Sequence, residues 1–257
     1  MISIIKKNKR LHRISAIILW LILWELLAGI IDQSLIVVSP TTVIYNLFLL
    51  MQGAEFWLAV SNSFVKISTG LILAIGVGVF LAVTSSIVEL MRIMLEPAIS
   101  VIKSIPVVSF IILVLIWTGT DYLSTVISFL IVLPIIYTNV LEGILNVDKK
   151  LLEMADVFNI PFKKKAFGIY IPNVMPYFIA ASKISLGLCW KSGVAAEVIG
   201  LPNGTIGEEL YAGKIFLSTE DVLTWTLVIV LISVVFEKVF LKVVNRIEKH
   251  ILSIGDK

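Results

Sequence analysis

Charged residues are scarce in this sequence. Asp, Glu, Lys and Arg make up 15% of the 257 residues, whereas hydrophobic residues make up 58% and the mean hydropathy is +1.02. A soluble domain has about 25% charged and about 45–50% apolar residues. The composition therefore excludes an ordinary soluble protein, and it predicts an all-α polytopic membrane protein.

The residues that build metal, disulfide and catalytic sites are also scarce. Cys189 is the one cysteine, which excludes an intrachain disulfide framework and a cysteine-rich metal site. The two histidines, His12 and His250, lie at opposite ends of the chain. The sequence contains no P-loop pattern G-x4-G-K-[ST] and no nucleophile elbow G-x-S-x-G. We expect no catalytic site, no metal and no cofactor on this chain, so any ATP hydrolysis belongs to a separate subunit.

Six hydrophobic segments predict six transmembrane helices. They extend over approximately residues 14–31, 62–86, 101–117, 122–145, 173–198 and 222–240. A membrane-crossing helix needs about 20 mostly apolar residues. The first segment could pass for a signal peptide, but its apolar run is too long and no small-x-small cleavage site follows cleanly. We therefore interpret it as a retained transmembrane helix.

Two features inside these spans predict contacts between helices. Glu25 lies in the middle of the first span, where a carboxylate should face protein or water rather than lipid. It serves either as a structural partner of a neighbouring helix or as a substrate contact, and we favour the structural role. In the second span, Ala74, Gly78 and Ala82 repeat every four residues, which allows another helix to approach closely.

The connections between the spans differ in character. Ser39 and Pro40 predict the start of an amphipathic surface helix that ends near residue 51. Residues 89–102 predict a short amphipathic connection. Residues 200–220 are rich in Gly and too polar to span a membrane, so we expect an outer loop or a re-entrant segment.

The basic residues predict the orientation of the chain. Lys and Arg gather in the N-terminal segment, in the 149–165 loop and in the C-terminal tail, while the opposite loops hold essentially only Lys214. Six spans place these three basic segments on one side, which must be the cytoplasm. Both termini are therefore expected to be cytoplasmic. Because each basic segment adjoins a hydrophobic span, we expect the membrane, and no nucleic acid, beside it.

Residues 153–172, EMADVFNIPFKKKAFGIYIP, form a polar and basic segment in this apolar chain. Asp148 is placed to cap a helix with apolar residues at helical spacing. Asn159 is placed to end that helix, because Asn tolerates the left-handed conformation. Pro161 suits the first turn of a second helix, and Pro172 is expected to close the segment.

This segment resembles the EAA loop of binding-protein-dependent ABC importer permeases. The family pattern is Glu-Ala-Ala, a Gly four residues after the second Ala, and then Ile-x-Leu-Pro. The residues in register are Glu153, Ala155, Ile169 and Pro172. The departures are Met154, Asn159 and Ile171, in place of Ala, Gly and Leu. The resemblance extends from about residue 61 to the C-terminus, and Trp190 to Glu197 resembles the nitrate, sulfonate and bicarbonate (taurine-like) branch.

The resemblance implies a type I permease fold with a coupling helix between the fourth and fifth spans. Residues 1–60 would hold the N-terminal tail, the first span and the outer amphipathic segment, and residues 61–257 the permease core. The chain would lie in the bacterial inner (cytoplasmic) membrane and pair with a second copy of itself. Its partners would be two ABC ATPase subunits, which bind ATP and Mg, and an extracytoplasmic substrate-binding protein.

The resemblance also implies roles for residues of the loop, which would dock on the ATPase. Glu153 would make charged contacts, Ala155 would allow close approach and Asn159 would make the turn. The apolar anchors would be Phe158, Ile160 and Phe162, since buried aromatic side chains often dominate interface energy.

The fifth predicted span is the most polar. The candidate residues of a translocation pathway are Lys183, Ser185, Lys191, Ser192 and Glu197. Lys183 and Lys191 lie roughly 80° apart around a helix, and an unpaired membrane lysine costs about 2.5–3.5 kcal/mol, so they suit an anion path. A structural alternative stays open, in which Lys183 snorkels to the interface and Lys191 pairs with Glu197 or Glu25.

The substrate implied by the resemblance is a small anion such as a sulfonate, nitrate or bicarbonate. A vitamin precursor of the pyrimidine or riboflavin type stays open. An ion-coupled transporter would need a relay of intramembrane carboxylates, and a membrane enzyme would need a histidine or acidic cluster at one depth. Glu25 and Glu197 are too few for a relay.

Overall fold

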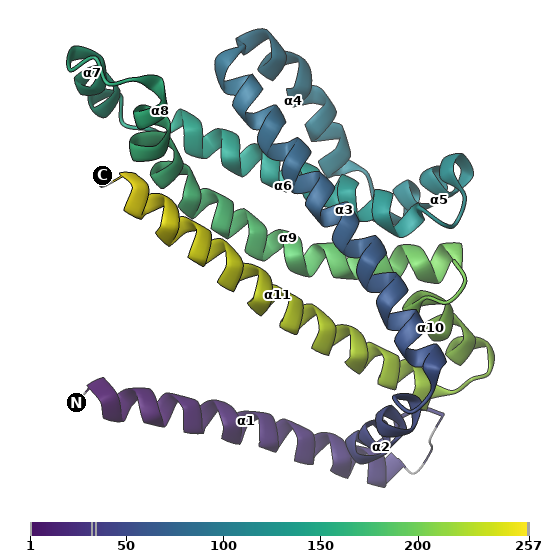
Figure 1. Ribbon diagram of the computed structural model, residues 1–257. Helices are drawn as coiled ribbons and strands as arrows, with labels where there is room; N and C mark the ends of the chain where they lie inside the picture. Colours follow the sequence, from purple (N-terminus) through teal and green to yellow (C-terminus); the bar gives the residue numbers. More distant parts are fainter. Residues whose placement is uncertain (1, 32, 34, 256–257) are drawn as a thin grey trace.

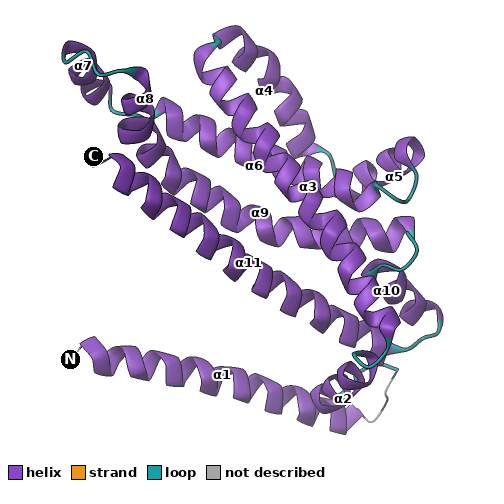
Figure 2. Cartoon of the chain, viewed as in Figure 1, coloured by secondary structure: helices purple, strands orange, loops and turns teal. Residues whose placement is uncertain are grey.

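The computed structural model describes residues 2–31, 33 and 35–255, and every regular element among them is helical (Figure 2). Side chains are described for residues 11, 12, 14–31, 33 and 35–249. The Lys and Arg side chains of residues 6–13 therefore lie outside the described part of the chain. In chain order the helices are α1 (Ile2–Ile31), α2 (Pro40–Leu50), α3 (Ala54–Ile87), α4 (Glu89–Ser104), α5 (Val107–Thr118), α6 (Leu123–Leu145), α7 (Lys149–Val157), α8 (Phe162–Lys165), the π-helix η1 (Ala166–Tyr170), α9 (Ile171–Gly200), α10 (Ile206–Ile215) and α11 (Thr219–Gly255). The predicted all-α fold is confirmed.

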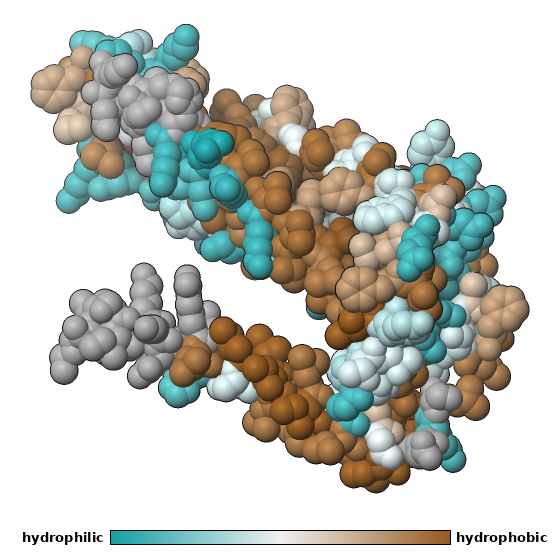
Figure 3. Space-filling model, turned by 60° about the horizontal axis from the view of Figure 1, so that its bottom comes forward, coloured by the Kyte–Doolittle hydropathy of each residue, from teal (hydrophilic) through white to brown (hydrophobic). Residues whose placement is uncertain are grey.

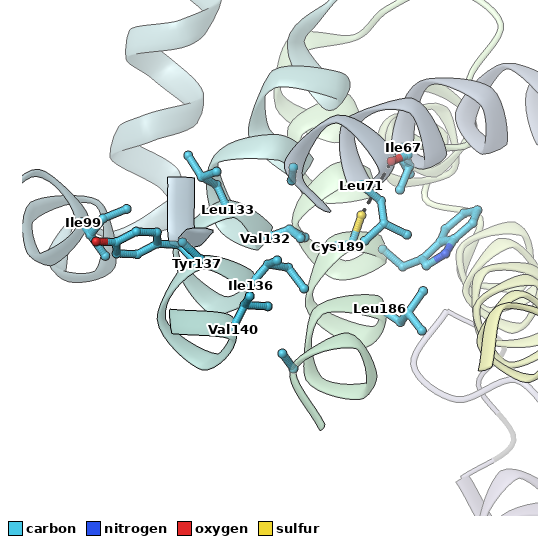
Figure 4. Packing of buried hydrophobic residues seen from close by; sticks show 14 of the residues in the cluster. Ile67, Leu71, Ile99, Val132, Leu133, Ile136, Tyr137, Val140, Leu186 and Cys189 are labelled. Atoms are coloured by element: carbon cyan, nitrogen blue, oxygen red, sulfur yellow. Dashed lines mark hydrogen bonds between the residues drawn. The ribbon is translucent and has the colours of Figure 1, made fainter. Parts of the chain in front are cut away.

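The centre of the molecule is a core of three helices, in which α6 packs along both α3 and α9 (Figure 1). Leu71, Ile136 and Leu186 belong to the buried cluster that joins them (Figure 4). Ala74 and Ala82 are completely buried, and a Cβ at Gly78 would lie 3.0 Å from the Cγ2 of Ile136. The predicted packing role of this small-residue repeat is confirmed, because α6 lies against it.

The first span is attached to the rest of the chain through α2. Ser39 caps α2 by accepting a hydrogen bond from the Thr42 amide at 3.2 Å, as its sequence predicts. The Glu25 carboxylate accepts bonds from the hydroxyl and the amide of Thr41, at 2.8 and 3.3 Å. The structure thus gives Glu25 a structural partner at the start of α2.

Beyond this contact, the described part of α1 diverges from the other helices and exposes its apolar side chains (Figures 1 and 3). Trp20 and Ile30 are examples of these exposed side chains. In Figure 3, apolar residues cover the length of the helices, and hydrophilic residues gather toward the two ends of the molecule. This distribution is the one expected of a protein surrounded by lipid.

Among the residues that the structure describes, three helical segments are each long and apolar enough to cross a membrane. They are Ile14–Ile31, Ala54–Ile87 and Leu123–Leu145, which correspond to the first, second and fourth predicted spans. The fifth and sixth predicted segments form α9, of 30 residues, and α11, of 37 residues. At about 1.5 Å per residue, both are longer than a bilayer core is thick, but neither is among these three segments, so the count of six spans stays a prediction.

The third predicted span, residues 101–117, is not a single helix. Ile105 adopts an extended conformation (φ −73°, ψ 131°), because the ring of Pro106 disfavours the helical region for the residue before it. Consequently α4 and α5 meet at an angle of 106°. α5 has 12 residues and extends about 18 Å, less than the roughly 30 Å of a bilayer core. The short amphipathic connection expected at 89–102 is the helix α4, which extends to Ser104 and packs beside α3.

Candidate functional site

The loop between α6 and α9 begins and ends its first helix as its sequence predicts. The Asp148 carboxylate caps α7 by accepting from the Lys150 amide at 2.9 Å. After α7, Asn159 has φ +51°, in the left-handed region. The Ile160 amide then reaches back to the Ala155 carbonyl at 2.9 Å, which closes the turn. Both local predictions are confirmed.

This loop presents apolar side chains on its surface. Phe158 is 73% exposed and Phe162 is 76% exposed, and α7 lies at the far end of the molecule (Figure 1). Glu153 is also exposed, Ile160 is half-buried and Ala155 is completely buried. The loop therefore combines two exposed aromatic rings, an exposed carboxylate and a small buried residue at its centre.

The second arm of the loop is basic and is tied to the first. Lys163 and Lys164 are exposed, and the Lys165 ammonium forms an ion pair with the Asp156 carboxylate. Pro161 is the residue before α8, one position earlier than predicted. Its carbonyl accepts hydrogen bonds from the Lys164 and Lys165 amides. The ion pair joins the two arms across the turn at Asn159.

Pro172 does not close the loop, contrary to the prediction. The helical path continues from Phe162 through η1 and α9 to Gly200. In η1 the hydrogen bonds reach one residue further back than in an α-helix, and the Ile171 amide donates to the Ala166 carbonyl. This wider turn precedes Pro172, whose ring nitrogen cannot donate, so the helix passes the proline without breaking. The second arm of the loop, α8, is thus continuous with η1 and α9, whereas the turn at Asn159 separates α7 from them.

The five candidate pathway residues of α9 fall on two different faces. Lys183 and Lys191 lie on the exposed face, and Gly187 between them is also exposed. The other three, Ser185, Ser192 and Glu197, are buried inside the chain.

Neither lysine forms an ion pair within the described part of the chain. The two carboxylates named as partners of Lys191 are engaged elsewhere, since Glu25 bonds Thr41 and Glu197 bonds Ser63. The structure therefore places the two lysines on one face, away from Ser185, Ser192 and Glu197. It does not contain the ion pair of Lys191 with Glu197 or Glu25 that the structural alternative requires.

Glu197 belongs to a junction that the sequence analysis did not identify. Its Oε2 accepts from the Ser63 hydroxyl at 2.7 Å and from the Gly207 amide at 3.3 Å. Ser63 in turn accepts from the Ile206 amide at 2.9 Å. The signal in the sequence is Thr205 followed three residues later by Glu208, the spacing of a capping box, which marks the start of α10.

A second group of carboxylates surrounds α10 at the surface. Burial raises the pKa of Glu209, and the nearby charges of Glu208, Glu55 and Asp221 raise it further. Asp221 also accepts a hydrogen bond from the Asn46 amide group at 2.9 Å. This end of the molecule is therefore acidic, whereas the loop at the other end of α9 is basic.

Comparison with known proteins places the chain in one family. Residues 74–252 match the family described as binding-protein-dependent transport system inner membrane component. The chain is 24% identical over 204 residues to SsuC of Bacillus subtilis (strain 168), a permease named for aliphatic sulfonates transport, covering 78% of this chain and 73% of SsuC. It is 24% identical to the taurine transport system permease protein TauC of Escherichia coli (strain K12), covering 72% and 67%. It is 22% identical to the nitrate import permease protein NrtB of Synechococcus elongatus, covering 72% and 70%.

Solved structures show the same fold. A chain from a bacterial ABC transporter involved in the import of the acidic polysaccharide alginate superposes with a TM-score of 0.59 at 17% identity, covering 95% of this chain and 98% of that one. A chain from an amino acid ABC transporter superposes with a TM-score of 0.51, covering 83% and 99%. The family match over 74–252 and the shared fold lead to one conclusion: this chain belongs to the membrane-spanning permeases of binding-protein-dependent ABC importers, and its relatives are those of the nitrate, sulfonate and taurine branch.

Proposed function

We propose that this chain is the translocation subunit of an ATP-driven importer of small anions, and that its α7–α8 loop is the coupling helix. Six spans, α4 and α5 together forming the third, place both termini and the loop in the cytoplasm of a bacterial cell. A separate ABC ATPase binds ATP and Mg and hydrolyses the ATP. When two ATPase subunits close, they bring two coupling loops together, and the spans open outward. ATP hydrolysis then returns the spans to the inward-open state.

The observation that carries this proposal is the exposure of Phe158 and Phe162 on the projecting loop. While the two aromatic rings stay in water, the chain forgoes the favourable free energy of burying them, which is about 25 cal/mol for each Å² of apolar surface. A partner with an apolar groove would bury them, and buried aromatic residues commonly dominate such interfaces. Ala155, which has no side chain beyond Cβ, is completely buried, so α7 packs closely at this position.

The exposed face of α9 supports the proposed pathway. A charged side chain within the membrane rarely faces lipid, because the insertion cost is about 2.5–3.5 kcal/mol. Lys183 and Lys191 share a face of α9 that is exposed among the residues that the structure describes. A second copy of the chain, facing the first across a water-filled path, would remove both lysines from lipid. Two lysines on that path would attract an anion.

The substrate class follows from this face and from the relatives. The relatives are named for sulfonate, taurine and nitrate transport, and each of these substrates carries an anionic group. We therefore propose a sulfonate, nitrate or bicarbonate delivered by an extracytoplasmic binding protein. An uncharged vitamin precursor is the competing substrate, and it would draw no benefit from the two lysines.

The ion-coupled alternative loses support from the positions of the two intramembrane carboxylates. Glu25 accepts hydrogen bonds at the start of α2, and Glu197 accepts them at the start of α10. Both carboxylates thus accept hydrogen bonds at the N-terminus of a helix, which is a structural role.

The first experiment is recovery of the tagged chain from its own membranes in mild detergent, with mass spectrometry of the co-purified proteins. We expect a stoichiometric ATPase that carries a P-loop. The double variant Phe158→Ala/Phe162→Ala should reduce recovery of that ATPase at least about tenfold, because each buried aromatic anchor commonly contributes 2 kcal/mol or more. The matched control is Phe216→Ala, which removes a ring that is 80% exposed beyond α10 and far from the loop.

Recovery of the chain alone from membranes that contain the ATPase would overturn the proposal. So would an unchanged yield of ATPase with the double variant. Uptake of labelled taurine, an alkanesulfonate and nitrate, each in competition with the others, then identifies the anion. Transport of an uncharged pyrimidine or flavin precursor instead would overturn the substrate assignment alone.

A further inference from the structure

Glu197 lies where three helices meet, and its carboxylate is completely buried there. It projects from the last two turns of α9 toward α3 and the start of α10. A buried carboxylate needs hydrogen bonds or a positive charge to offset the loss of hydration. Here the Ser63 hydroxyl and the Gly207 amide both donate to Oε2, while Oε1 has no hydrogen-bond partner in the described part of the chain. The partial positive charge of the α10 N-terminus adds to them.

The first amides of α10 are all satisfied by side chains. The first N–H groups of a helix have no partner within the helix. In α10 the Ile206 amide donates to Ser63 of α3, the Gly207 amide to Glu197 of α9, and the Glu208 amide to Thr205 at 3.4 Å. Two of these three acceptors come from other helices. The start of α10 is therefore fixed to α3 and α9 and not only to its own capping residue.

The packing at this junction leaves no room for movement between α9 and α10. A Cβ on Gly207 would lie 2.2 Å from the Cβ of Glu197 and 2.5 Å from its carbonyl carbon. Close by, the Asn62 amide group of α3 donates to the Gly204 carbonyl at 2.8 Å. The two helices are in backbone contact where the carboxylate bonds, so α10 must follow any displacement of this end of α9.

The other end of α9 is continuous with α8, the second arm of the proposed coupling loop. The helical path from Phe162 to Gly200 has no break, and Glu197 lies in its last turn. We propose that Glu197 is a positioning residue for transport: it fixes α10 to α9 through Ser63 and Gly207, so that α10 at the outer surface moves with the loop. This inference rests on the proposed function, because it requires the loop to be displaced by the ATPase.

The anchor itself is tested by hydrogen–deuterium exchange of the purified complex of this chain with its ATPase. Glu197→Ala removes the acceptor, while Glu197→Gln keeps one side-chain oxygen for Ser63 and Gly207. We expect exchange of the amides at 206–210 to accelerate about tenfold or more in the alanine variant, as for loss of a helix cap, and less than about threefold in the glutamine variant. Ser182→Ala is the control, since Ser182 is equally buried on α9 and its hydroxyl has no partner in the described part of the chain.

The positioning role is tested by ATP hydrolysis of the same complexes in liposomes. Glu197→Ala should retain basal hydrolysis and lose most of the stimulation by the substrate-loaded binding protein, and Glu197→Gln should restore it. A defect of folding alone would lower the yield of complex and its basal hydrolysis together, and Glu197→Gln would not separate the two readouts.

Each failure has a distinct signature. Unchanged exchange at 206–210 in Glu197→Ala would overturn the anchor, whatever the chain transports. Faster exchange with normal stimulation and uptake would overturn the positioning role. If the wild-type complex shows no ATP-driven uptake, the proposed function fails, and the exchange experiment still decides whether Glu197 holds α10.

Discussion

The helical path that contains α9 ends in two very different surroundings. At the loop end, Phe158 and Phe162 are exposed, and a Cβ on Gly168 would meet nothing within 4 Å. At the α10 end, Glu197 is completely buried, and a Cβ on Gly207 would collide with the backbone of α9. The loop end leaves apolar side chains exposed, whereas at the α10 end the helix-opening amides and one carboxylate oxygen of Glu197 are hydrogen-bonded within the chain.

On the proposed function, one helix from Phe162 to Gly200 would connect the docking loop to the closed junction at α10. Interior packing is dense and behaves as discrete arrangements rather than as a soft spring. A displacement imposed on α8 would therefore be carried to α10 along this helix, as the proposal requires. A substitution at the loop end should change assembly and coupling with little effect on stability. A substitution at the α10 end should change stability first.

The largest effect is expected from Glu153→Lys at the loop end. This substitution adds a positive charge to a loop that already exposes Lys163 and Lys164. The new charge repels any basic residue of the ATPase that contacts position 153. We expect uptake to fall to background while the amount of chain in the membrane stays unchanged. Like-charge contacts at an interface cost several kcal/mol.

The control is Glu89→Lys, which reverses an exposed carboxylate at the start of α4 whose ion pair with Arg92 is weak. Uptake and yield should both survive this change. Normal uptake with Glu153→Lys would remove Glu153 from the coupling interface.

The second effect is a loss of stability at the α10 end. Gly207→Ala forces its new methyl group into the backbone of α9, and such overpacking costs up to about 3 kcal/mol. We expect the midpoint of thermal unfolding in detergent, followed by tryptophan fluorescence, to fall by about 5–10 °C. Gly168→Ala at the loop end should leave the midpoint unchanged, because its methyl group has open space. Equal effects of the two substitutions would contradict the contrast between the ends.

A third and smaller effect is expected from the stretch between the ends. Lys191→Gln removes one positive charge from the exposed face of α9 and should raise the KM for an anionic substrate about tenfold, since hydrogen bonds to charged groups contribute about 1.5–3 kcal/mol. Assembly with the ATPase and the thermal midpoint should not change. Lys238→Gln, an exposed lysine of α11, is the matched control. A KM equal to that of the control would remove Lys191 from the pathway.

Local signals predicted much of the loop end and little of the α10 end. Asp148 and Asn159 act through their own neighbours in sequence, so a cap and a left-handed turn were predictable from residue type. Glu197 acts through Ser63, which is 134 residues earlier, and no local pattern records such a pair. For the same reason the sequence named Glu197 as a pathway residue beside Lys191, although a helix carries the two on different faces.

Two prolines caused errors in the predicted helix boundaries, and both errors follow from the surroundings of the proline. Pro106 was expected inside a span, but the restriction that it places on Ile105 separates α4 from α5. Pro172 was expected to end the loop, but the wider turn of η1 absorbs it. A proline disfavours one helical hydrogen bond, and only the surrounding packing decides whether the helix breaks, bends or widens.

The smallest effect concerns Glu209 on α10 and depends on pH. Because burial and the charges of Glu208, Glu55 and Asp221 raise its pKa, Glu209 binds its proton more tightly in the folded chain than in the unfolded chain. The free energy of unfolding therefore decreases as the pH rises from the ordinary pKa of glutamate through the raised value, and it stays decreased above that value. Glu209→Gln is neutral at every pH and should raise the thermal midpoint slightly at pH 8, but not at pH 4. Part of this gain should persist in 0.5 M NaCl, about a 4 Å screening length, because burial is the larger cause and salt screens only the repulsion. An equal rise of the thermal midpoint at both pH values would show that the charge of Glu209 does not destabilise the α10 end of the molecule.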